Sequence, residues 1–78
     1  MMKQKPQLPA PFRDMVASFP ESSMGTSRIK LALSNGQRVY DVFVAGDGII
    51  VKIGNKMIEK MEDLKFSPSD ITNVTSEI

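Results

Sequence analysis

Four residues of this chain combine charge and aromatic character in a way that suits ligand binding: Arg28, Lys30, Phe43 and Lys52. Basic side chains around an exposed aromatic ring can hold a phosphate and stack a base, as in proteins that bind single-stranded nucleic acids. The alternative is that Phe43, together with Val39, Ile50 and Ala32, lies under a helix or forms a second core layer, and that the Lys and Arg stems cover its rim. We favour this alternative, because three cations beside Asp41 make a small electrostatic attraction for phosphates.

The sequence holds no pattern typical of a catalytic or metal centre. It contains no His and no Cys, which are the commonest general base and the thiolate ligand of metal sites. Its acidic residues match no metal-loop spacing, and its serines have no His or Lys relay. The glycines of residues 45–48, AGDG, precede a β-branched strand and not the helix that a phosphate-binding loop requires. We therefore expect no enzyme, no catalytic residue, no metal site and no cofactor.

Length and composition predict one small domain. The 78 residues are near the lower limit for a single hydrophobic core, and a charged fraction of 24% argues against disorder. The net charge of +1 gives no general attraction to nucleic acid or membrane. The longest apolar run is too short to span a bilayer, and the N-terminus has no apolar signal region. These features predict a cytoplasmic protein without membrane association.

Three antiparallel strands in residues 28–54 are expected to position the four candidate residues. Asn35-Gly36 and Asp47-Gly48 are the turn signals, because a type I′ turn needs positive φ at both central residues. Side chains alternate between the faces of a strand, so these turns also define the two faces of the sheet.

The predicted register gathers apolar side chains on one face of this meander. They are Ile29, Leu31, Leu33, Tyr40, Val42, Val44, Ile49, Val51 and Ile53. The mixed face carries Arg28, Lys30, Ala32, Val39, Asp41, Phe43, Ile50 and Lys52. On the mixed face, Arg28 and Lys52 both lie opposite Phe43, and Lys30 lies opposite Asp41 as a favourable cross-strand pair.

The chain before the meander is divided into an arm and a helix. Residues 1–10 are expected to form a flexible Pro-rich arm, because prolines at positions 6, 9 and 11 prevent a regular helix. The arm either docks on another chain or is a frayed terminus. Residues 11–78 are expected to form a single small domain. Its first element is a helix over residues 11–19, whose apolar stripe is Phe12, Met15, Val16 and Phe19. We expect the stripe to pack within the chain; packing against a partner subunit is the alternative.

The chain after the meander contains one ambiguous segment, KMIEKMEDLKF at residues 56–66. A helix places Met57, Ile58, Met61 and Leu64 on one side, which predicts Met57 and Met61 as adaptable core residues. The alternation of Leu64 and Phe66 leaves a strand as the alternative for its end. Residues 67–70 predict a turn, and residues 71–76 a short closing strand. Because Ile71 and Val74 do not alternate strictly, a bulge or a brief helical turn is expected there.

The order of these elements resembles the Sm-like small-barrel layout. The resemblance covers residues 11–76, and its most specific piece is LALSNG at residues 31–36. It implies a small, partly open barrel and suggests ring assembly. The family's usual Gly in the second strand falls near Asp41 here, and its later Arg-Gly signature is absent. No RNA-contacting residue is therefore transferred to this chain.

Together these observations predict a β-rich α+β domain that acts as a non-enzymatic interaction module or accessory subunit. Self-association or a protein partner is expected, because the chain combines a Pro-rich arm with a substantial supply of apolar residues and lacks a catalytic constellation. The alternative is a small domain that binds single-stranded nucleic acid through Arg28, Lys30, Phe43 and Lys52.

Overall fold

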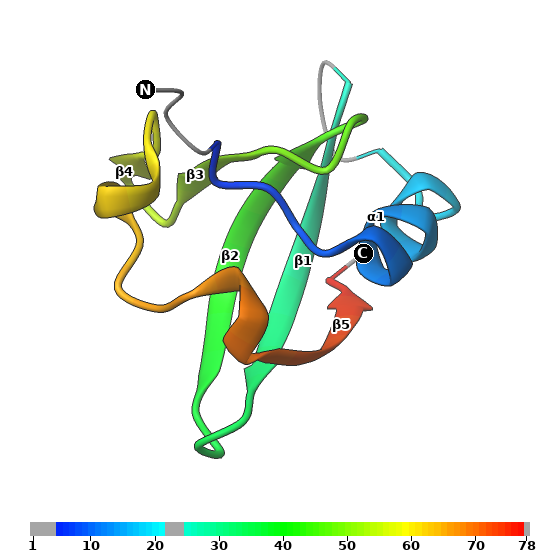
Figure 1. The fold of residues 1–78 in the computed structure, drawn as a ribbon. Coiled ribbons are helices and arrows are strands. Elements are labelled where there is room, and N and C mark those ends of the chain that lie inside the picture. The colour runs from blue at the N-terminus through cyan, green and yellow to red at the C-terminus, as the bar shows by residue number, and fades with distance from the viewer. Residues whose placement is uncertain (1–4, 22–24, 78) are drawn as a thin grey trace.

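The computed structural model describes residues 5–21 and 25–77, which form one helix and a five-stranded antiparallel sheet (Figure 1). The elements are α1 (Ala10–Ala17), β1 (Thr26–Leu33), β2 (Arg38–Ala45), β3 (Ile50–Ile53), β4 (Lys56–Met57) and β5 (Ile71–Ser76). The strand order is β4-β3-β2-β1-β5, so the last strand returns to pair with the first. The sheet is not closed into a barrel, since β4 and β5 are its two edges. The predicted β-rich α+β class is confirmed.

Both hairpins of the meander use a loop one residue longer than predicted. In the first, the N–H of Gly36 donates to the carbonyl oxygen of Leu33, and the N–H of Leu33 donates to that of Gln37. The second loop has the same pattern, with the N–H of Gly48 bonded to the oxygen of Ala45. The glycines have φ of 87° and 84°, the left-handed conformation of a G1 bulge. The predicted two-residue type I′ turns are therefore wrong, although both turns lie where they were predicted.

The longer first loop shifts the pairing of β1 with β2 by one residue, and a bulge in β2 restores the predicted pairing farther from the turn. Ile29 pairs with Val42 as predicted, but Leu31 pairs with Val39 and not with Tyr40. One extra residue in β2 lies between these two pairs, and it exchanges the faces of the side chains on its turn side. Val39 consequently packs against the core, whereas Tyr40 is 52% exposed. The prediction that Tyr40 belongs to the apolar face is wrong.

A second bulge lies between β2 and β3. Phe43 pairs with Lys52 as predicted, but Val44 pairs with Ile50 and not with Val51. Ile50 therefore moves from the predicted mixed face into the core, where it is fully buried. Bulges increase local twist and bend a strand, so these two shifts help the sheet to curve around its apolar side.

The core lies between the concave side of the sheet, α1 and the two segments that flank the meander. Its buried apolar residues are Leu8, Val16, Ile29, Leu31, Leu33, Val42, Val44, Ile50, Ile58, Leu64, Ile71 and Val74. The predicted N-terminal helix is present, and it lies beside β5 (Figure 1). Val16 is buried, Phe12 and Phe19 pack against the core, and Met15 is 38% exposed.

The segment before α1 is part of the core, which differs from the arm expected there. Pro6 and Leu8 are buried. The N–H of Leu8 donates to the oxygen of Gly48, and the N–H of Ile50 donates to the oxygen of Pro6. The Nε2 of Gln7 adds a hydrogen bond to the carbonyl oxygen of Asp47. Residues 5–9 are thus held along the start of β3 by backbone pairing, a pairing that polyproline-type conformation permits because it is extended.

The predicted helix over residues 56–66 is wrong. Lys56–Met57 forms the short strand β4, and the N–H of Ile58 donates to the oxygen of Val51. A 3-10 turn follows over Met61–Asp63. A short helix is only marginally stable by itself, and this segment instead forms a hairpin that extends the sheet. Ile58 is buried, but Met57 is 61% exposed, so the expectation that Met57 fills the core is also wrong.

The carboxylate of Asp63 organises this turn. Its Oδ2 accepts hydrogen bonds from the backbone N–H of Glu59 at 2.9 Å and of Lys60 at 3.2 Å. These bonds favour the charged form, with that from Glu59 the larger influence, and they hold the pKa of Asp63 below its usual value.

The last strand matches its prediction. A 3-10 turn over Pro68–Asp70 precedes β5, and the register with β1 shifts between Ala32 and Leu33. Both the helical turn and the bulge expected from the spacing of Ile71 and Val74 are therefore present.

Candidate binding surface on the outer face of the sheet

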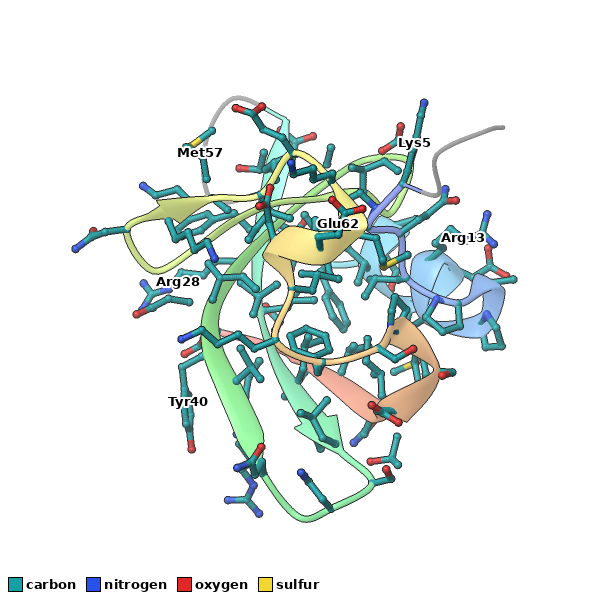
Figure 2. All side chains as sticks on the ribbon, turned by 60° about the vertical axis from the view of Figure 1, so that its left-hand side comes forward. Lys5, Arg13, Arg28, Tyr40, Met57 and Glu62 are labelled. Carbon is teal, nitrogen blue, oxygen red and sulfur yellow. The ribbon has the colours of Figure 1, made fainter. Side chains whose placement is uncertain are left out.

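The candidate residues lie on the convex side of the sheet, which we call the outer face. It consists of Arg28, Lys30, Arg38, Tyr40, Asp41, Phe43, Lys52 and Met57. Figure 2 shows Arg28, Tyr40 and Met57 projecting from one side of the sheet, away from α1. The rest of the face is placed by strand pairing.

A row of side chains crosses four strands of this face. Arg28 in β1 pairs with Phe43 in β2, Phe43 pairs with Lys52 in β3, and Lys52 pairs with Met57 in β4. Directly paired residues of antiparallel strands project to the same side. The prediction that Arg28 and Lys52 both lie opposite Phe43 is confirmed, and β4 extends the row by one residue that the sequence assigned to a helix.

Two cations lie against aromatic rings of the outer face. The Nζ of Lys52 is 5.3 Å from the ring centroid of Phe43, and the Nζ of Lys30 is 5.9 Å from that of Tyr40. Both distances are within the range of attraction between a cation and the face of a ring. Such pairs keep the lysine stems along the sheet, so each ring and its cation present a combined apolar and charged surface.

Asp41 lies at the bulge in β2 and forms the ionic contact of this face. Its Oδ1 is 2.7 Å from the Nη2 of Arg28 and accepts a hydrogen bond from the Nε at 3.0 Å. This pair replaces the predicted pair of Asp41 with Lys30. Asp41 has φ of 55°, and it is the one non-glycine residue with positive φ in the described part of the chain. An aspartate tolerates that conformation better than most residues, but the conformation still costs energy.

Glu77 supports the same bulge from the edge of the sheet. Its Oε1 accepts a hydrogen bond of 2.7 Å from the N–H of Asp41, and its own N–H donates to the carbonyl oxygen of Arg28. Glu77 is not predictable from the sequence, because it lies at the far end of the chain and no local pattern links it to Asp41. With Glu77 included, the outer face carries two acidic groups beside its four cations.

No described element covers the outer face, in contrast to the arrangement favoured from the sequence. Phe43 is partly buried but is not among the residues that pack against the core. Val39 and Ile50, expected beside it in a second core layer, lie on the opposite side of the sheet. The second core layer is therefore wrong, and Phe43 lies between two cations on an open surface.

Metal-ligand clusters and membrane-spanning helices are absent from the described residues. Over residues 5–21 and 25–77, no three acidic side chains gather where they could hold a metal ion. Over the same residues, no helix is both long and apolar enough to cross a membrane.

Comparison with known proteins adds no relative. The chain matches no family model, no curated protein and no solved structure. The outer face itself is therefore the basis for proposing a function.

Proposed function

We propose that this chain is a non-enzymatic interaction module that self-associates through its outer face. The observation that carries the proposal is the uncovered row of Arg28, Phe43, Lys52 and Met57, with Tyr40 beside it. Aromatic residues, Met and Arg are enriched at protein interfaces and supply most of the binding energy there.

A second copy is the partner that this face suits best. In a two-fold dimer the same surface meets itself, so it must be self-complementary. The outer face meets that condition, because Asp41 and Glu77 carry charge opposite to that of Arg28, Lys30 and Lys52. A standard interface buries about 800 Å² on each partner, roughly one-sixth of the 5145 Å² that this chain exposes. A face that crosses four strands can provide such a contact.

Light scattering coupled to size exclusion, over a wide range of protein concentrations, tests this proposal. We expect a concentration-dependent dimer, and we expect Tyr40→Ser or Met57→Ser to raise its dissociation constant by about tenfold or more. Met15→Ser is the matched control, because Met15 is the other large exposed apolar residue among those described and lies on α1. A protein that stays monomeric at every concentration would contradict the proposal. A dimer weakened equally by all three substitutions would contradict the assignment to this face.

Single-stranded nucleic acid is the second candidate partner. Its specific support is the pair of cation–ring contacts, Lys52 on Phe43 and Lys30 on Tyr40, since stacked bases and phosphates need rings and cations side by side. Fluorescence anisotropy with a labelled oligonucleotide should then show salt-sensitive binding that Phe43→Ala weakens. We rank it second, because Asp41 and Glu77 offset two of the four cations.

Two further expectations belong to this proposal. One is that the open sheet represents a partly open small barrel with the Sm-like order of elements. The other is a cytoplasmic location, which the cysteine-free composition favours.

A further inference from the structure

The ion pair of Arg28 and Asp41 places opposite charges side by side on the outer face. The Nη2 and the Nε of Arg28 both lie against Oδ1 of Asp41, at 2.7 and 3.0 Å. The Nη1 of the guanidinium and the Oδ2 of the carboxylate form no hydrogen bond among the described residues. The two side chains are 43% and 48% exposed, so the pair is open to further partners from outside the chain.

Backbone contacts hold this pair in place before any partner binds. Asp41 lies at the bulge in β2 with φ of 55°, and its N–H donates to Oε1 of Glu77. The N–H of Glu77 in turn donates to the carbonyl oxygen of Arg28. The backbone of both residues is thus tied to Glu77, and their side chains are tied to each other. Groups that are already ordered lose less conformational entropy on binding.

A two-fold contact restricts where the charges of the outer face can lie. A group close to the two-fold axis faces its own copy, and like charges that face each other weaken an interface. Lys52 and Lys30 lie over the rings of the outer face, so an axis through either would bring two lysines together. An axis that passes between Arg28 and Asp41 instead places each charge opposite its counterion in the second copy.

We propose that the two-fold axis of the dimer passes through the Arg28–Asp41 pair, so that Arg28 of each copy binds Asp41 of the other. This inference rests on the proposed self-association and defines its register. The four groups form a closed ring of alternating charges, in which each guanidinium uses its Nη1 and each carboxylate its Oδ2. Each charge also keeps its counterion within the chain, so the interface buries none of them unpaired.

Charge inversion tests this register. Arg28→Glu leaves two acids at the contact and Asp41→Lys leaves two cations, so each variant should dimerise about tenfold or more weakly than the wild type. An equimolar mixture places acids against cations, and we expect a heterodimer within about threefold of the wild-type dissociation constant. Light scattering measures the affinities, and native mass spectrometry identifies the heterodimer by its mass.

Lys52→Glu mixed with Asp41→Lys is the matched control. It inverts a cation of the same face, on the other side of Phe43 from Arg28, and should give a weaker heterodimer than Arg28→Glu does. Equal heterodimers would indicate a general attraction between opposite charges and would overturn the register. Homodimers that neither inversion weakens would also overturn it. A wild-type chain that is monomeric at every concentration would contradict the proposed function, and this contact with it.

A second set of variants avoids a lysine at the positive φ of Asp41, where it could prevent folding. Arg28→Gln, Asp41→Asn and their double variant remove the charges, and Asn tolerates this conformation. Because the reciprocal pairs are lost together, the double variant should dimerise no more weakly than the weaker single variant. Independent effects that multiply in the dissociation constant would overturn the proposal.

Discussion

Leu8→Ala should destabilise this protein strongly, although Leu8 lies in a segment that its sequence marks as a flexible arm. Leu8 is 1% exposed and belongs to the core cluster. Its backbone N–H is bonded to the oxygen of Gly48, and the neighbouring Pro6 accepts a bond from Ile50. The backbone pairing at Pro6 and at Leu8 limits how far the segment can move to fill a cavity.

The expected loss follows from the size of that cavity. Removing a buried leucine side chain down to alanine costs about 2–5 kcal/mol, with the larger values where the site cannot collapse. We expect about 3 kcal/mol, because Leu8 is held by backbone bonds but lies near a chain end. A chain of 78 residues has a total free energy of unfolding of only about 4–12 kcal/mol. The melting temperature should therefore fall by about 12 °C or more.

Urea unfolding followed by far-ultraviolet circular dichroism is the suitable assay, since the chain has no Trp. Met57→Ala is the control for truncation of a large side chain, because Met57 is 61% exposed, and it should change stability by no more than about 0.5 kcal/mol. Protein concentrations below any detectable association keep the two variants comparable. If Leu8→Ala costs less than about 1 kcal/mol, the reasoning that makes residues 5–9 part of the core is refuted.

Three other perturbations test local features of the fold. Asp41→Gly should be more stable than Asp41→Ala by about 1 kcal/mol in urea unfolding. Both variants lose the carboxylate, but only Gly adopts φ of 55° without strain. A more stable Ala variant, which is the usual order in strands, would contradict this. Gly48→Ala should cost more stability than Gly36→Ala, because both glycines have left-handed φ but a Cβ at Gly48 also meets the arginine side chain of α1; equal costs would argue against that contact. The lowered pKa of Asp63 means that its stabilisation of the turn is complete above the unfolded pKa of about 3.9 and is lost as pH falls through the lower folded pKa. The amide shift of Glu59 should report that midpoint in an acid titration, and a midpoint at or above the unfolded value would count against the hydrogen bond.

The positions of the elements in the chain were largely predictable. The two Gly-containing turns, the strands they join, the N-terminal helix and the closing strand all follow from short-range signals: turn residues, a helical stripe and β-branched runs. The predicted facing of Arg28 and Lys52 with Phe43 is met, because in each hairpin a bulge between the turn and Phe43 offsets the extra residue of the loop. The prediction failed for the segment around Ile58, where the competing helix and strand differ only in their contacts with distant residues.

What the sequence determined by itself is therefore which residues form the meander and which of them share the row through Phe43. Periodicity and turn preferences depend on residues that are close together in the chain, so they can be recognised from the sequence alone. The tertiary structure alone decided on which face of the sheet Tyr40 and Ile50 lie. The two bulges that expose Tyr40 and bury Ile50 satisfy the curvature of a sheet around its core, and no local pattern encodes that curvature. It also decided that residues 5–9 complete the core and that Glu77 supports the bulge at Asp41, because both contacts join segments that are far apart in the chain.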